Sequence, residues 1–227
     1  MLTLFHGDKG GVGKSFCCCT YLDALMTQGR AEHLVVVESD TRNADVWRLF
    51  HQHLAVEKLD LKERAGWMRV VDLLDENPER EVVISLPAGI GQQLEKESGY
   101  LTFALDNMGH PLSVFWPINR MKDSVILLKA FLATPLAAKA SRTTVIMNGF
   151  FGELEQFSRW RESKTRTEFL KRPGAREIYL PELHHRVIDT VAAPFSQALK
   201  DLPFSARIEL ERWISQNYQQ FFTSQEV

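Results

Sequence analysis

The chain has 227 residues, of which 44% are hydrophobic and 25% charged, and its formal net charge is −2. These values are typical of one globular domain, which we expect to span residues 1–227. The small net charge excludes a polycation, so any nucleic-acid site has to be a local patch. No apolar run approaches the roughly 20 residues of a membrane span, and a predicted strand at the start leaves no room for a signal peptide. We therefore expect a cytoplasmic protein.

The first predicted elements enclose a glycine-rich turn. An apolar run at residues 2–5 precedes the segment Gly7-Asp-Lys-Gly-Gly-Val-Gly-Lys-Ser15, and a helical pattern follows to about Gln28. Strand, glycine-rich turn and helix form the context of a phosphate-binding loop, in which backbone N–H groups face an anion. Lys14 would contact terminal phosphates, and the Ser15 hydroxyl would reach Mg²⁺. The alternative is a turn that binds nothing, which the Lys-Ser pair and its context disfavour.

The head of this loop is unusual, because Asp8 replaces the expected glycine and a second lysine, Lys9, follows it. The loop resembles the deviant Walker A motif of the ParA/MinD family, dimerising P-loop ATPases that position plasmids, chromosomes and division proteins. The resemblance implies a P-loop NTPase of the ParA-like (SIMIBI) class that uses ATP and Mg²⁺. It also implies that Lys9 reaches the partner's nucleotide in an ATP-bound homodimer. The residues expected to hold the nucleotide are Gly10, Gly11, Val12, Gly13, Lys14, Ser15 and Phe16.

A continuous apolar run at residues 33–37 predicts a buried parallel strand, and acidic residues follow it. The family usually has Asp-x-Asp here, whereas this chain has Glu38-Ser39-Asp40. By resemblance, Asp40 orients the attacking water and Glu38 lies near the metal. The alternative is a solvated loop with incidental acids. Residues 44–76 are then predicted to be helical.

The next strand, near residues 81–84, leads into Ser85-Leu-Pro-Ala-Gly89, which looks like the family's Walker B and switch II segment. The family has an aspartate at the position of Ser85, where it orders Mg²⁺ through a water. A hydroxyl is a weaker metal partner than a carboxylate. We therefore expect slow hydrolysis, compensation by Glu38, or nucleotide binding with little turnover.

The remaining chain alternates predicted helices at 90–107 and 119–133 with strands at 112–117, 143–148 and 177–181. Six apolar strands alternating with helices indicate an α/β fold with a mostly parallel central sheet flanked by helices. By resemblance, Asn148 recognises adenine, and the loop after Pro181 folds over the base. A lone asparagine at a strand end is also a common turn former.

Residues 159–176 carry seven basic residues against two acidic ones. This excess predicts either phosphate contacts with non-specific DNA or a solvated helix face. His184 and His185 are expected to be loop or cap residues. Residues 204–222 predict a helix that packs on the domain or a partner, since Glu209, Glu211 and Glu226 argue against a basic membrane-binding tail. The DNA-contact candidates are Arg159, Arg161, Lys164, Arg166, Lys171 and Arg172.

Together these features predict an ATP-dependent dimerisation switch with weak ATPase activity, acting with a partner or adaptor protein in plasmid or DNA partition, stability or conjugative transfer. The segment from Ser85 to Gly89 resembles the plasmid StbB/TraL-like branch more than MinD. One alternative is a nucleotide-dependent scaffold with little or no hydrolysis. Another is a metabolic P-loop kinase or synthetase, which has no need of Lys9.

Overall fold

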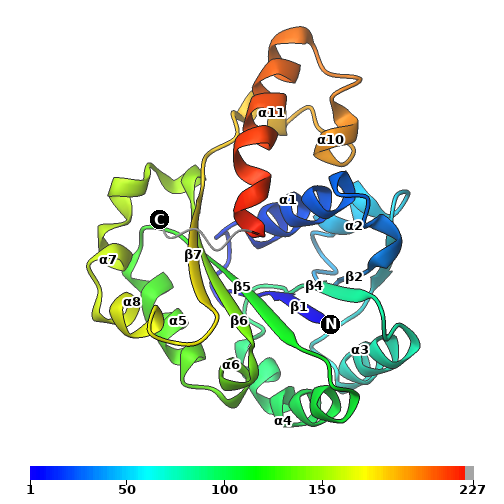
Figure 1. The fold of residues 1–227 in the computed structure, drawn as a ribbon, viewed down its shortest axis with the longest axis vertical. Helices are drawn as coiled ribbons and strands as arrows, with labels where there is room; N and C mark the ends of the chain where they lie inside the picture. Colours follow the sequence, from blue (N-terminus) through cyan, green and yellow to red (C-terminus); the bar gives the residue numbers. More distant parts are fainter. Residues whose placement is uncertain (223–227) are drawn as a thin grey trace.

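The computed structural model describes residues 1–222, which form an α/β structure around one seven-stranded sheet (Figure 1). The strand order is β3-β2-β4-β1-β5-β6-β7, and every neighbouring pair is parallel. The predicted parallel sheet is thereby confirmed. The strands are β1 (Leu2–Phe5), β2 (Leu34–Glu38), β3 (Ala55–Lys58), β4 (Glu81–Ser85), β5 (Leu112–Ile118), β6 (Arg142–Asn148) and β7 (Ala175–Leu180).

Helices cover both faces of this sheet. Those on one face are α1 (Lys14–Thr27), α2 (Asp45–Phe50), α10 (Phe195–Ala198) and α11 (Phe204–Asn217), and those on the other are α3 (Arg64–Glu76), α4 (Gly91–Met108), α5 (Lys122–Leu132), α6 (Pro135–Lys139), α7 (Ser158–Arg161) and α8 (Lys164–Phe169) (Figure 1). Helix α9 (His185–Ile188) and the 3-10 turns η1 (Ala31–His33), η2 (Gly149–Phe151), η3 (Leu154–Phe157) and η4 (Tyr218–Phe221) complete the elements. Each face has its own apolar core, which explains why the central strands are continuously hydrophobic.

The structure corrects one part of the sequence prediction. Residues 44–76 are not all helical, because Ala55–Lys58 forms the edge strand β3 beside β2. Its burial pattern has exposed residues at both ends, so it lacks the apolar run that marks the inner strands. Sequence periodicity therefore gives no strand signal at this edge.

The carboxyl ends of the central strands meet at one edge of the sheet. The register pairs Phe5 and Glu38 with Ser85, so the ends of β1, β2 and β4 lie side by side. At the other side of β1, Asn148 at the end of β6 pairs with Leu180 of β7. Ligands of open parallel sheets bind at this edge, and the glycine-rich loop follows β1 there.

The C-terminal helix is anchored to α1, as the sequence predicted for packing on the domain. Asp23 is fully buried in α1 and accepts hydrogen bonds from the Ser196 backbone N–H at 2.8 Å and the Ser196 hydroxyl at 2.7 Å. Tyr218 also donates to this carboxylate. Burial raises the pKa of Asp23, and the three donors oppose that shift. This polar anchor joins the segment around α10 and α11 to the helix that follows the glycine-rich loop.

Two further features match the sequence analysis. Cys17, Cys18 and Cys19 are buried free thiols in α1, and burial raises the pKa of each, so they pack as small apolar residues. Across residues 1–222, none of the helices combines the length and the apolar character needed to cross a membrane. The part of the C-terminal tail prediction that rests on Glu226 lies outside the described residues.

Candidate functional site

The loop between β1 and α1 has a backbone that only glycine allows at two positions. Gly11 and Gly13 have φ angles of +72° and +89°, in the left-handed region. A Cβ atom on Gly13 would lie 2.2 Å from the Nδ2 atom of Asn148, well inside van der Waals contact. The loop is thus packed directly against the end of β6. This close approach leaves the N-terminal turn of α1 open toward a cavity.

Among residues 1–222, Lys14 is a buried cation that forms no salt bridge. Its side chain is only 8% exposed, and its Nζ donates to the Lys9 carbonyl oxygen at 3.2 Å. The ion pairs of this part of the chain all join other residues. Burial lowers the pKa of Lys14, and the more distant carboxylates of Asp8 and Asp40 partly oppose this effect. A buried ammonium at a helix N-terminus is arranged to receive an anion.

Lys14 faces a cavity of about 370 Å³. Several predicted site residues line it together, namely Gly11, Val12, Gly13, Lys14, Ser15, Phe16, Asp40 and Asn148. The other lining residues are not among the predicted site residues; they are Asn43, Asp45, Leu86, Ala88, Phe150, Phe151, Glu182, Leu183 and Ile188. They all follow the carboxyl ends of β2, β4, β6 and β7, so the rule for ligand sites in parallel sheets would have pointed to these loops.

Lys9 lies outside this cavity. Its Nζ forms an ion pair with the Asp123 carboxylate at 3.1 Å, in the first turn of α5, and both side chains are partly exposed. Gly10 is exposed at the loop surface and does not line the cavity either. The head of the loop therefore contacts α5, while its second half surrounds the cavity.

The two acidic residues after β2 have different surroundings. Glu38 is 1% exposed, and its carboxylate oxygens accept backbone N–H groups of Asp40 at 2.9 Å and Val46 at 3.0 Å. Burial raises the pKa of Glu38 to about 7, against the effect of these donors. Glu38 is absent from the cavity lining, so the contacts observed stabilise the turn into α2 and do not support the expected metal role. Asp40 lines the cavity, and its Oδ1 accepts the Arg42 and Asn43 backbone N–H groups.

Ser85 is buried at the end of β4, with 1% of its surface exposed. Its carbonyl oxygen accepts the Ser39 hydroxyl at 2.5 Å and the Ser39 N–H at 3.3 Å, which holds the ends of β2 and β4 together. Within the described part of the chain, no three His, Cys, Asp or Glu side chains are grouped to hold a metal ion. Mg²⁺ commonly binds through phosphates and waters with one or two protein oxygens. Among the side chains that line the cavity, those of Ser15, Asp40, Asp45 and Glu182 carry a hydroxyl or carboxylate oxygen of this kind.

Asn148 ties the far end of the cavity to the loop. Its Nδ2 donates to the Val12 carbonyl oxygen at 3.0 Å, and its Oδ1 accepts the Phe150 N–H at 3.2 Å. Pro181 does not line the cavity, but its carbonyl oxygen accepts the Trp213 indole N–H at 2.9 Å. The next residues, Glu182 and Leu183, do line it. The loop after β7 therefore lines the cavity through these two residues, whereas the candidate Pro181 itself does not line it.

The basic segment is only partly available to a ligand, because two of its predicted DNA-contact residues have partners within the protein. Arg166 donates to the buried Glu177 carboxylate at 2.8 Å, and Trp160 donates to the same carboxylate at 2.9 Å. Arg172 donates to the carbonyl oxygens of residues 132 and 137. Arg166 and Arg172 thus have structural roles. The exposed members are Arg159, Arg161, Lys164 and Lys171.

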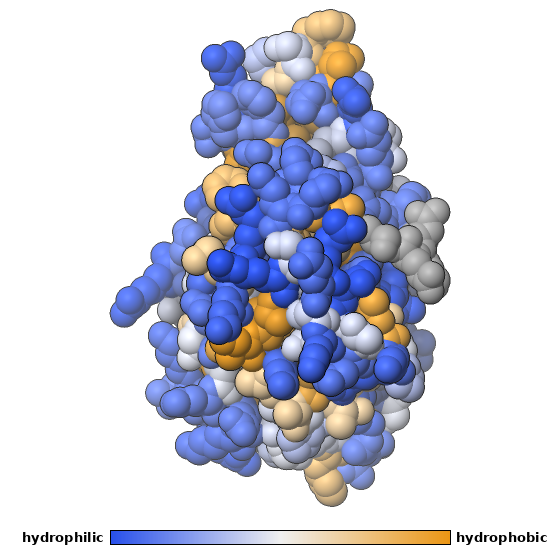
Figure 2. All heavy atoms as spheres, turned by 90° about the vertical axis from the view of Figure 1, so that its left-hand side faces the viewer, coloured by the Kyte–Doolittle hydropathy of each residue, from blue (hydrophilic) through white to orange (hydrophobic). Residues whose placement is uncertain are grey.

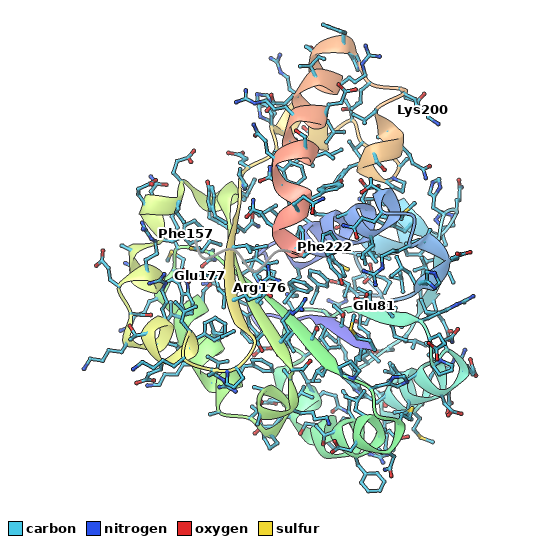
Figure 3. The ribbon with its side chains drawn as sticks, in the orientation of Figure 1. Glu81, Phe157, Arg176, Glu177, Lys200 and Phe222 are labelled. Atoms are coloured by element: carbon cyan, nitrogen blue, oxygen red, sulfur yellow. The ribbon has the colours of Figure 1, made fainter. Side chains whose placement is uncertain are left out.

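Strand β7 divides its charged side chains between the two faces of the sheet. Figure 3 shows Glu177 on the side of α7 and α8, whereas Arg176 lies toward the end of α11. There Arg176 donates to the carbonyl oxygens of Phe221 and Gln220.

The molecular face that presents α7 and α8 is mostly hydrophilic (Figure 2). His184 caps α9, as expected, by accepting the Arg186 N–H.

Comparison with known proteins identifies relatives of this chain. A scan against protein-family models finds no match. Protein MobD of Acidithiobacillus ferrooxidans is 36% identical over 213 residues, which cover 92% of this chain and 91% of that protein. The MinC:MinD cell division protein complex of Aquifex aeolicus contains a chain with a TM-score of 0.54 at 14% identity, covering 95% of this chain and 94% of that one.

A nucleotide-binding protein in complex with ADP from Archaeoglobus fulgidus gives a TM-score of 0.49 at 11% identity, over 100% of this chain and 92% of that chain. The MinD likeness, together with the loop and the all-parallel sheet, confirms the predicted fold. The chain belongs to the family of Protein MobD and has the fold of the ParA/MinD-type P-loop ATPases.

Proposed function

We propose that this protein binds ATP and Mg²⁺ in the cavity beside Lys14 and acts as a dimerisation switch with weak ATPase activity. The observation that carries the proposal is the buried Lys14 ammonium, which lacks a counterion among the described residues and lies at the N-terminus of α1. A phosphate chain supplies the missing negative charge. The left-handed glycines of the loop would let backbone N–H groups and the helix end turn toward it.

In this proposal, three residues of the cavity have defined contacts. Ser15 would hold Mg²⁺, which neutralises phosphate charge when bound, and Asp40 would orient the attacking water. Phe150 would pack on the base, since it lines the cavity and is 62% exposed. The ends of the cavity thus match the two ends of a nucleotide: cationic at the loop and apolar near β6 and β7.

Dimerisation is proposed from the position of Lys9 at the head of the loop. Its ammonium lies outside the cavity of its own chain and is held by a partly exposed ion pair with Asp123. A side chain so placed is free to exchange this partner for a phosphate of a second copy. The MinD of the structural comparison occurs in a complex with MinC, so we also propose a partner protein for this chain. The cellular role proposed is plasmid or DNA partition, stability or conjugative transfer, in the cytoplasm.

Calorimetry with ATP and Mg²⁺ tests the binding site. Lys14→Ala should weaken binding at least roughly tenfold, because a charged hydrogen bond contributes about 1.5–3 kcal/mol. Lys122→Ala, which removes an exposed lysine at the start of α5, is the matched control and should bind like the wild type. Equal affinities for all three proteins would refute the proposal.

A nucleotide-dependent scaffold with little or no hydrolysis is the second candidate, and Ser85 favours it. This position offers a neutral hydroxyl, and the residue is buried outside the cavity lining. Phosphate release separates the two functions. If the protein is a weak ATPase, it releases phosphate from ATP, and Asp40→Ala abolishes this release. If it is a scaffold, the wild type and Asp40→Ala both bind ATP and release phosphate at the same background rate.

A further inference from the structure

A second cavity, of about 270 Å³, lies between α4 and α5 on the face of the sheet opposite α1. Its helical residues recur at the spacing of one helix face, at 91, 94, 95 and 98 on α4 and at 127, 130 and 131 on α5. The floor is formed by strand β5 and the end of β1. The cavity is lined by His6, Asp8, Gly91, Gln92, Leu94, Glu95, Ser98, Trp116, Leu127, Ala130, Phe131, Thr134 and Leu136.

The floor contains a polar side chain that the fold leaves unsatisfied. His6 is 3% exposed, and its Nδ1 has no hydrogen-bond partner in the part of the chain that the structure describes. The ring contacts Trp116 and Phe131 edge-on, with centroids 4.6 and 5.2 Å away. Burial, assisted by the charge of Lys14, lowers the pKa of His6 to about 3. The imidazole is therefore neutral and offers one donor and one acceptor.

The walls and the rim have different chemistry. Leu94, Leu127 and Leu136 form apolar walls around the aromatic floor. The charged lining residues are Asp8 and Glu95, both acidic, and the lining contains neither Lys nor Arg. The cavity therefore suits an apolar ring with a positive group at its edge, and it disfavours phosphates and carboxylates.

We propose that this cavity binds a small aromatic amine. The ring would occupy the space beside Trp116 and Phe131, and a ring N–H would pair with the free acceptor of His6. The ammonium group would lie at the rim, near Asp8 and Glu95. Such a ligand satisfies the buried imidazole and balances the acidic rim at the same time. The site is separate from the nucleotide cavity, since the two share no lining residue.

One lining residue connects the amine site to the glycine-rich loop. The Asp8 Oδ1 accepts the Gly91 N–H at 2.9 Å, and the Asp8 carbonyl oxygen accepts the Gly89 N–H at 3.0 Å. Asp8 thus fastens the head of the loop to the start of α4. This gives a physical role to the residue that departs from the general glycine pattern. A bound amine would contact Asp8 without entering the nucleotide cavity.

Titration with tryptamine, in the absence of nucleotide, tests the site by calorimetry or NMR. We expect a dissociation constant below ~1 mM, as is usual for a well-placed fragment of this size. Ala130→Trp places a bulky ring at the exposed mouth of the cavity and should abolish binding. Ala133→Trp, on the exposed C-cap of the same helix but outside the lining, should not change it. Absence of wild-type binding, or equal binding by the Ala130→Trp variant, would overturn the proposal.

Two further comparisons test the contacts. The ligand 3-propylindole has the shape of tryptamine without the ammonium, so it should bind at least about fivefold more weakly; equal binding contradicts the role of the acidic rim. His6→Phe should raise the melting temperature, because it removes an unsatisfied buried group, and should weaken tryptamine binding. A His6→Phe protein that melts lower than the wild type shows that His6 already has its partner, which refutes the argument. Lys14→Ala should retain tryptamine binding, so failure of the nucleotide proposal leaves this test intact.

Discussion

The buried carboxyl of Glu38 should make the stability of this protein depend on pH. Its pKa is about 7 in the folded state, compared with 4.5 for an ordinary glutamate. The folded state therefore binds the proton more tightly than the unfolded chain does. The stabilising contribution is fully present below pH 4.5 and is lost as the pH rises through 7. One pKa unit corresponds to about 1.4 kcal/mol, so the full loss is about 3 kcal/mol.

The test compares urea unfolding of the wild type and Glu38→Gln at several pH values from 5 to 8. Glutamine cannot ionise, so the unfolding free energy of the wild type relative to the variant should fall by roughly 2–3 kcal/mol across this interval. The other titrating groups are common to both proteins and cancel in the difference. With a urea m-value of about 2–3 kcal/mol/M, the relative midpoint moves by about 1 M.

Glu32→Gln is the matched control, because it makes the same substitution at a side chain that is 81% exposed. Its stability should run parallel to that of the wild type at every pH. Parallel curves for Glu38→Gln as well would mean that Glu38 titrates normally in the folded state. The assignment of its buried contacts with the turn into α2 would then be wrong.

Two predictions concern the surface. Asp123→Asn removes the ion pair that holds Lys9. An ion pair at this exposure is worth at most about 1 kcal/mol, so we expect little change in melting temperature. ATP-dependent dimerisation, measured by size-exclusion chromatography, should occur at a lower protein concentration. Unchanged dimerisation would show that Asp123 does not restrain Lys9. If the exposed residues near α7 and α8 contact DNA phosphates, charge reversal at Arg161 and Lys164 should weaken sequence-independent binding and flatten its salt dependence in filter or anisotropy assays. Retention of DNA with an unchanged salt slope would identify these residues as a solvated face.

The central strands were predictable because they are continuous apolar runs, and the loop was predictable because its glycines, lysine and serine occur at fixed intervals. The helix that begins at Lys14, the strand that ends at Glu38 and the helix that ends at Met108 all lie within a few residues of their expected places. Edge strand β3 was not predictable in this way, since half-exposed residues carry no clear period. Two short helices, α7 and α8, also have too few turns for a periodic signal.

The candidate site was predictable in its loop but less so in its side chains. Glu38 and Arg166 illustrate why. Residue type suggested a metal ligand and a phosphate contact, but Glu38 is held by backbone N–H groups and Arg166 by Glu177. Residue type does not reveal either partnership: Glu38 is bound by N–H groups of the turn that follows it, and Arg166 by a carboxylate on the neighbouring strand β7. The roles of Lys9, Lys14 and Asp40 stay predictions that the experiments above address.

The two hydrogen bonds of Asn148 have a consequence for base discrimination. A carboxamide has two N–H donors and an oxygen with two lone pairs, and Val12 and Phe150 each use one of these. In the proposed complex, one donor and one acceptor of the carboxamide would remain for a base. Adenine offers a donor and an acceptor at N6 and N7, and guanine offers them at N1 and O6, so the remaining groups alone would not separate the two bases. Discrimination would then depend on how the loop and the 3-10 turn after β6 orient the carboxamide.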